Sequence, residues 1–193
     1  MLFNLSLLEQ AANLNSDRSQ LPEASQIVSA LLEREKIDWH KNRSYNDLIG
    51  TWNLRFITGT KKTRKRAGIV LGAGRYIPKF IDITITYDRE LLGSDRGSVT
   101  NTVKLGFITL SLSGPAEFIL PKNILAFDFT KMKITVFGLQ LYDGYLKKGV
   151  ARETNFYSKK LKEKAFFKYF LIEENAIAAR GRGGGLALWG RKN

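Results

Sequence analysis

The sequence predicts a mainly β protein with N-terminal helices, in which an antiparallel sheet of about eight strands closes on itself. Two observations carry this prediction. A helical period of apolar residues ends before Ile49, and a period of two follows it along nearly all of the remaining chain. Seven to nine short strands without further helices of useful length argue against alternating strand–helix units. Closing such a meander into a barrel removes its exposed edges.

Two helices are predicted before the sheet. Residues 4–14 form the first, where Ser6 and Glu9 have the spacing of a capping box and four apolar residues share one side. Pro22 suits the first turn of the second helix. The apolar stripe of that helix has helical spacing and consists of Ala24, Ile27, Val28, Leu31 and Leu32. One or two of these helices are expected to cover the barrel.

The strands follow from alternation. Ile81, Ile83, Ile85 and Tyr87 alternate with polar residues, and Val99–Leu112 is predicted as one long strand with a bend near Gly106, where the apolar side switches. Glu173–Asn175 is a plausible turn. Further strands are expected near Ile119 and at Ile124–Phe129, Lys133–Phe137, Lys164–Ile172, Ala176–Arg180 and Leu186–Trp189.

Length and composition indicate one folded domain. The 193 residues suffice for a single core, with 1–40 as a helical segment and 48–190 as the barrel. With 44% hydrophobic and 25% charged residues the chain is typical of globular proteins. No apolar run reaches the roughly 18 residues of a membrane span, and Met1–Leu5 lacks the basic start of a secretory signal. A soluble or peripheral membrane protein is expected.

Catalytic and metal chemistry find little support. The chain has no cysteine and one histidine, His40. The sequence therefore indicates neither a zinc site nor a Ser-His-Asp triad, and no cofactor is predicted. Asp82, Asp88, Glu90 and Asp95 are interpreted as solvated carboxylates. The glycines in 181–185 and 72–74 lack the residues of phosphate-binding and dinucleotide-binding loops, which favours tight turns.

Charge is large and uneven. The net charge is +13; residues 1–40 carry −3 and residues 41–75 carry +8. Five basic residues lie in a run that is predicted to join the first two strands: Lys61, Lys62, Arg64, Lys65 and Arg66. A specific nucleic-acid site would require interleaved aromatics, which are absent beside this run. An anionic membrane surface and a merely solvated loop remain the two interpretations.

Several motifs together resemble one family. They are Leu7-Leu8-Glu9, Gly50-Thr51-Trp52-Asn53-Leu54, Lys168-Tyr169-Phe170-Leu171, Ala179-Arg180-Gly181 and Gly184-Gly185-Leu186-Ala187-Leu188. In these positions the whole chain resembles the fibrillin or plastid-lipid-associated protein (PAP) family of plastids and cyanobacteria, itself similar to lipocalins. One departure is Asn175-Ala176-Ile177, where members often carry a further arginine. The basic run is also heavier than the family pattern.

The resemblance implies a lipocalin-like antiparallel barrel that associates with thylakoid or lipid-globule membranes. It implies small lipophilic cargo, such as quinones, tocopherols, carotenoids or fatty acids, and it does not imply catalysis. The expected location is the cyanobacterial cytoplasm, peripheral to the thylakoid, or a plastid for a trimmed mature form.

The resemblance also implies site residues. In lipocalin-like barrels a first-strand tryptophan packs under a last-strand arginine, so Trp52 and Arg180, with Gly50 and Gly181, are expected to close one end. We favour a structural plug over direct ligand contact for this pair. The predicted ligand-binding residues are aromatic: Phe56, Phe107, Phe127, Phe137, Phe167 and Tyr169. The alternative is that these rings simply fill the barrel.

Three functions remain after this reasoning. The first is non-enzymatic binding of a small lipophilic molecule by a protein associated with membranes. The second is a scaffold protein whose filled barrel docks a protein partner or a lipid surface. The third, least favoured, is an enzyme that acts on an isoprenoid or a pigment.

Overall fold

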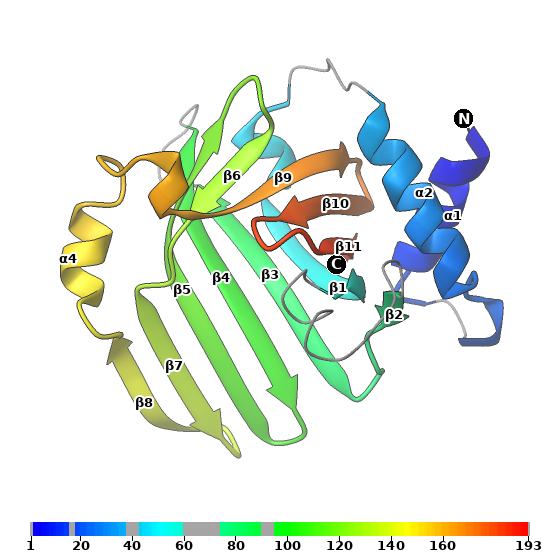
Figure 1. The fold of residues 1–193 in the computed structure, drawn as a ribbon. Coiled ribbons are helices and arrows are strands. Elements are labelled where there is room, and N and C mark those ends of the chain that lie inside the picture. Colours follow the sequence, from blue (N-terminus) through cyan, green and yellow to red (C-terminus); the bar gives the residue numbers. More distant parts are fainter. Residues whose placement is uncertain (1, 16–17, 38–42, 60–73, 90–94, 193) are drawn as a thin grey trace. The chain divides into compact units, whose positions relative to one another are not determined.

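The computed structural model describes residues 2–15, 18–37, 43–59, 74–89 and 95–192 of the chain (Figure 1). The helices are α1 (Leu2–Ala12), α2 (Ala24–Lys36) and α4 (Gly149–Thr154), with short 3-10 helices at Arg18–Gln20, Tyr45–Leu48 and Leu161–Glu163. The strands are β1 (Gly50–Thr58), β2 (Gly74–Tyr76), β3 (Ile81–Arg89), β4 (Arg96–Leu105), β5 (Ile108–Ile119), β6 (Ile124–Phe127), β7 (Lys131–Val136), β8 (Leu139–Tyr145), β9 (Ala165–Ile172), β10 (Ala176–Gly181) and β11 (Leu186–Arg191).

The strand order confirms the predicted fold class. Hydrogen bonds connect the strands as β4-β3-β1-β11-β10-β9-β6-β5, and β4 also pairs with β5. The order therefore returns to its starting strand, which makes an eight-stranded antiparallel barrel with N-terminal helices. β7 and β8 continue from β5, and β2 pairs with β1.

The chain divides into two compact units. The first unit comprises Met1–Asn42, Trp52–Ile77 and Phe167–Asn193, and the second comprises Arg43–Thr51 and Pro78–Phe166. Each unit combines segments that lie far apart in the sequence.

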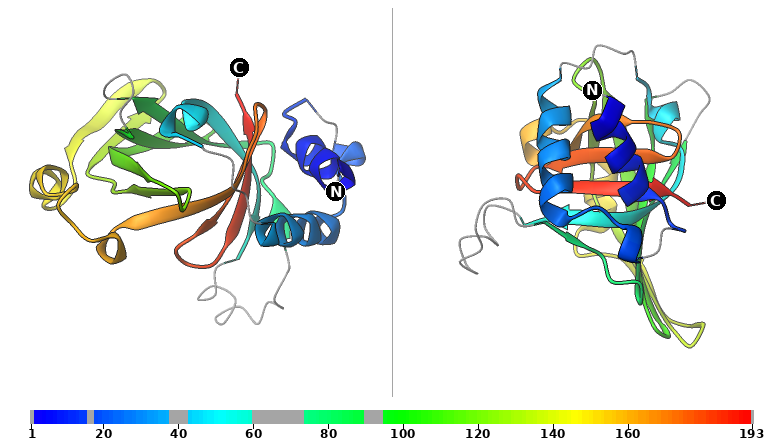
Figure 2. Two further views of the ribbon diagram at one scale, coloured as in Figure 1. Left: turned by 90° about the horizontal axis from the view of Figure 1, so that it is seen from above. Right: turned by 90° about the vertical axis from the view of Figure 1, so that its right-hand side faces the viewer.

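In the first unit, α1 and α2 lie side by side over one face of the strands β1, β11 and β10 (Figure 2). The core between them confirms the predicted helical stripes except at Leu32, which is 39% exposed on α2. Its buried members are Leu8, Ala11, Ala12, Ile27, Val28, Ala30, Leu31, Phe56, Phe170, Leu171, Ala176, Ala178, Leu186 and Leu188. Because the buried stripe positions recur every three to four residues, they reach this face together.

The predicted helix starts need correction. α1 already begins at Leu2, so Ser6 and Glu9 lie inside the helix and form no capping box. α2 begins after Glu23, whose backbone N–H donates to the Gln26 side chain at 3.1 Å. Pro22 therefore precedes the cap and does not occupy the first turn.

The second unit holds β3, β4, β5, β7 and β8 as consecutive antiparallel neighbours, with β6 paired to β5 (Figure 1). The prediction of one bent strand over Val99–Leu112 is wrong. Leu105 pairs with Ile108, so Gly106 and Phe107 form a two-residue hairpin turn in which Gly106 has a φ of +56°. The apolar residues are odd-numbered before the turn and even-numbered after it, because a two-residue turn pairs Leu105 with Ile108 on the same face of the sheet.

β8 and α4 were not predicted. β8 was missed although it follows a Phe137-Gly138 turn, because its polar and apolar residues alternate poorly around a β-bulge. α4 has only six residues, too few for a helical period to be visible in the sequence. The predicted turns at Glu173–Asn175 and in 181–185 are confirmed. In the second, the N–H of Gly181 donates to the Gly185 carbonyl and the N–H of Gly184 donates to the Gly181 carbonyl.

Candidate functional site

The predicted pairing of Trp52 with Arg180 is wrong in its partner. Trp52 is fully buried in the first unit, and the guanidinium carbon of Arg191 lies 4.0 Å from the centre of its ring. Trp52 and Arg191 are direct partners in the register of β1 and β11. Nε of Arg191 donates to the carbonyl of Glu174 at 2.5 Å. The expected stacking of guanidinium on indole exists, but the last residue of β11 provides it.

Arg180 has different partners, which also lie in the first unit. Its Nε donates to the Glu35 carboxylate at 2.6 Å, its Nη1 donates to the Gly184 carbonyl at 2.6 Å, and Nη2 completes a two-pronged ion pair with Glu35. The hydrogen bonds to the Glu35 carboxylate hold the pKa of Arg180 above its ordinary value. The arginine therefore ties the last turn of α2 to the β10–β11 hairpin.

The two predicted glycines have conformational roles. Gly50 has a φ of +118°, which other residues rarely adopt, at the start of β1. Gly181 donates its N–H to the Gly185 carbonyl at 2.9 Å and so opens the β10–β11 turn. The conformation of Gly50 explains its residue type without a ligand, whereas a Cβ would also fit at Gly181.

Three aromatic rings gather in the first unit. Phe167 meets Trp189 edge-on with ring centres 5.5 Å apart, and the ring centre of Tyr169 lies 6.3 Å from that of Phe167. Of the predicted ligand-binding set, the structure brings together Phe167 and Tyr169 in this cluster. Phe56 does not belong to it. Phe56 is fully buried in the core shared with α1 and α2, so it is a packing residue and the prediction of ligand contact is wrong there.

The remaining predicted aromatics lie in the second unit. Phe127 is buried, with its ring centre 5.2 Å from that of Phe129. Phe107 and Phe137 stack on each other at 4.1 Å, but they occupy hairpin turns and are 54% and 73% exposed. Both were predicted as ligand-binding residues, but neither lines an interior cavity, because each lies at the outermost point of its hairpin.

The sheet of the second unit has two chemically different faces. Residues paired across antiparallel strands share a face, and one face carries three rows that run across five strands. The rows are Ile81-Leu105-Ile108-Val136-Leu139, Ile83-Val103-Leu110-Ile134-Tyr142 and Ile85-Asn101-Leu112-Met132-Gly144. We call this surface the apolar face. Apart from Ile85, its members are only partly buried or exposed.

The alternation of Ile81, Ile83 and Ile85 predicted one strand of this surface. The neighbours across the sheet were not predictable, because their pairing depends on the hairpin at Gly106, where a bend in one strand was expected. The opposite face of the same strands carries threonine, serine, lysine and aspartate, including Thr102, whose hydroxyl lies 3.0 Å from that of Ser111.

A pocket of about 460 Å³ also lies in the second unit. Its lining is polar and comprises Arg89, Gly97, Ser98, Thr100, Ser113, Gly114, Pro115, Lys131, Glu153 and Tyr157. Lys131 donates to Glu153 at 3.2 Å, so these two charges compensate each other. Such a lining suits a small polar molecule better than lipophilic cargo.

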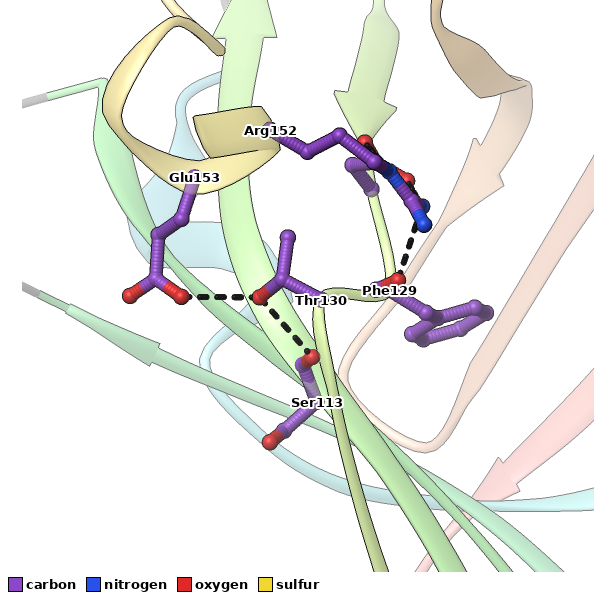
Figure 3. A network of polar contacts seen from close by, with 6 residues as sticks. Ser113, Phe129, Thr130, Arg152 and Glu153 are labelled. Atoms are coloured by element: carbon purple, nitrogen blue, oxygen red, sulfur yellow. Dashed lines mark hydrogen bonds and ion pairs between the residues drawn. The ribbon is translucent and has the colours of Figure 1, made fainter. Parts of the chain in front are cut away.

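Polar contacts fix α4 beside this pocket (Figure 3). The Thr130 hydroxyl donates to the Glu153 carboxylate at 2.9 Å and lies 3.5 Å from the Ser113 carbonyl. Arg152 forms a two-pronged ion pair with Asp128 and donates to the Phe129 carbonyl at 2.8 Å. The carboxylate and guanidinium of α4 are therefore engaged in holding the helix.

Some predicted residues lie outside the described part of the chain. These are Lys61, Lys62, Arg64, Lys65 and Arg66, together with His40 and Glu90. Across the described ranges, no three His, Cys, Asp or Glu side chains gather in a way that could hold a metal ion. None of the described helices is long and apolar enough to cross a bilayer.

Comparisons with known proteins add no assignment. Neither the protein-family models nor the curated proteins gave a match to this chain. The fold and the chemistry of the apolar face are consequently the basis for inferring function.

Proposed function

We propose that this protein binds small lipophilic molecules without catalysing a reaction, and that the apolar face of the second unit forms the binding surface. The candidate ligands are a lipid, a quinone, a carotenoid or a fatty acid. The observation that carries the proposal is three apolar rows across five strands that remain partly exposed to solvent. A fold of this class would otherwise bury such residues in its core.

The driving force would be removal of apolar surface from water. Each Å² contributes roughly 25 cal/mol, and full burial of one Val, Leu or Ile side chain contributes about 1.5–3 kcal/mol. Members such as Val103, Leu110 and Ile134 are half-buried, so a bound chain or ring would gain the free energy of burying the part of these side chains that is still exposed. Binding by area discriminates weakly between lipophilic compounds.

One side chain on the apolar face could orient a ligand. Asn101 lies between Ile85 and Leu112 in the third row, where it is the one side-chain amide among the three rows. Its N–H groups suit a carbonyl or carboxylate oxygen. The Tyr142 hydroxyl, in contrast, donates to the Tyr145 carbonyl at 3.0 Å. A quinone or fatty acid would thus place its oxygen near Asn101 and its chain along the second row.

The experiment measures binding of cis-parinaric acid by fluorescence, with Ile134→Lys as the test variant. A lysine on the apolar face weakens binding at least about tenfold, because its ammonium must be desolvated by the bound chain. Thr135→Lys is the control, since Thr135 is the next residue and faces the opposite side. Equal affinity of both variants, or no binding by the unaltered protein, would contradict the proposal.

Membrane association is the second part of the proposal. We propose a location at thylakoid or lipid-globule membranes, as in the fibrillin/PAP proteins that the motifs resemble. The run Lys61, Lys62, Arg64, Lys65 and Arg66 supports this on sequence grounds, since each basic residue near an anionic leaflet contributes about 1 kcal/mol. Mass spectrometry of small molecules that co-purify from the native host would identify the ligand.

A scaffold that docks a protein partner is the alternative. β8 favours it, because this strand pairs with β7 alone in the strand order and nearly all of its residues are exposed. Native mass spectrometry separates the two functions. Protein that carries no lipophilic molecule and takes up none in titrations would favour the scaffold.

A further inference from the structure

Exposed apolar residues gather at one end of the second unit's sheet. They come from the outermost row of the apolar face, from the turns beyond it and from the residue before β3: Phe80, Leu105, Phe107, Ile108, Phe137 and Leu139. We call this group the hairpin tip. All six are exposed, and Phe80 is 70% exposed. Scattered exposed apolar residues are common, but a contiguous group of this kind marks an interaction surface.

The two hairpin turns lie side by side (Figure 1). Phe107 in the β4–β5 turn and Phe137 in the β7–β8 turn have ring centres 4.1 Å apart and an angle of 6° between their planes. Because β5 pairs directly with β7, the register holds both turns at the same end of the sheet. The tip is therefore a preformed aromatic edge on a rigid sheet.

Phe137 is an unfavourable residue for its turn. Phe137 and Gly138 have φ values of +50° and +78°, the conformation of a two-residue turn that favours Asn-Gly. A phenylalanine there is strained, and its ring is 73% exposed, so core packing does not compensate. Folding alone would favour asparagine. Beyond its stack on Phe107, the exposed ring of Phe137 is available for a contact outside the protein.

Charge favours a lipid surface over an apolar protein surface. Lys79 and Lys104 flank the tip, opposed there by Asp82, which pairs with Lys104. Residues 78–166 carry fourteen basic and nine acidic side chains, and the whole chain carries +13. Apolar and aromatic residues flanked by lysine, on a cationic protein, match the boundary between anionic headgroups and acyl chains.

We infer that the hairpin tip inserts into the interface of an anionic bilayer and docks the protein there. This inference rests on the membrane association in the proposed function and identifies the residues that enter the lipid. Since the outermost row of the apolar face belongs to the tip, docking would place the second and third rows next to the acyl region. A lipophilic molecule could then pass from the bilayer to the apolar face without crossing water.

The test uses sedimentation of the full chain with vesicles of phosphatidylcholine containing phosphatidylglycerol, or of phosphatidylcholine alone. The variants are Phe107→Ser and Phe137→Asn, singly and together. The double variant should lower the partition coefficient at least about tenfold, since two rings lose their burial in lipid. Phe137→Asn alone should also lower the partition coefficient, and it should not lower the melting temperature, because asparagine suits the turn. Phosphatidylcholine alone should bind the unaltered protein more weakly.

The matched controls are Val150→Ser on α4 and Leu32→Ser on α2, which remove exposed apolar side chains outside the tip. They should leave partitioning unchanged. A Phe137→Trp variant should be quenched by lipids brominated on their acyl chains, which reports insertion directly.

Three results would overturn the inference. They are undiminished vesicle binding by the double variant, absence of quenching, and self-association through the tip that disappears in the double variant while vesicle binding stays. Cis-parinaric acid titrations in the absence of vesicles separate this inference from ligand binding. If cis-parinaric acid binds normally but the tip does not insert into vesicles, the inference about the tip fails and the apolar face still stands as a binding surface.

Discussion

Replacing Gly190 by alanine tests how α1 lies against the sheet of the first unit. Gly190 is in β11, and a Cβ added there would lie 1.9 Å from the Ala12 carbonyl oxygen and 2.9 Å from its carbonyl carbon. Real Cβ atoms do not approach backbone this closely. Ala12 ends α1 and is buried, so the helix end has to move away from β11.

The magnitude follows from this overlap. Overpacking a close-packed core costs about 1–3 kcal/mol, and the upper end applies because the obstacle is backbone and not a flexible side chain. In proteins of 150–250 residues each kcal/mol lowers the melting temperature by about 2–4 °C. Gly190→Ala should therefore melt about 6–12 °C below the unaltered protein.

Gly181→Ala is the control. At Gly181 the nearest atom to an added Cβ is a Phe167 ring carbon at 3.6 Å, an ordinary contact. The unfolded chain loses conformational freedom on this change, which stabilises by about 0.4–1 kcal/mol where the native conformation is compatible. Thermal unfolding followed by circular dichroism compares the two variants. Equal melting temperatures would show that α1 does not rest on β11 as described, and the reasoning would fail.

Three further predictions concern the first unit. Arg191→Ala removes the guanidinium over Trp52 and the bond to the Glu174 carbonyl, and should cost about 1–2 kcal/mol of unfolding free energy in urea. Arg180→Ala leaves Glu35 unpaired, so Arg180→Ala with Glu35→Ala should be more stable than Arg180→Ala alone; a less stable double variant would refute the pairing. Stability should also fall at high pH. Burial raises the pKa of Tyr76 to about 12, above about 10 in the unfolded chain, so its contribution is complete below pH 10 and is lost between about pH 10 and 12. Burial raises the pKa of Tyr45 as well, so Tyr76→Phe should reduce but not abolish the drop in urea midpoint; an unchanged drop would exclude Tyr76 as a source.

The two N-terminal helices, most strands and two of the turns were predictable because they depend on local periodicity. The stripe of Ile27, Val28 and Leu31 defines the buried side of α2 from spacing alone, and the alternation in Ile81–Tyr87 defines the two faces of β3. The glycines between Gly181 and Gly185 likewise indicate a turn, because they tolerate backbone conformations that other residues avoid.

Which residues meet across the sheet depended on register, and only the tertiary structure decided it. Trp52 faces Arg191 and not Arg180, because β11 extends two residues beyond the predicted end and brings its last side chain opposite β1. A period of two assigns a side chain to a face, but it contains no information on depth along the strand. Phe127 is consequently buried while Phe107 and Phe137 are exposed at the hairpin tip, although all three satisfied the same sequence criterion.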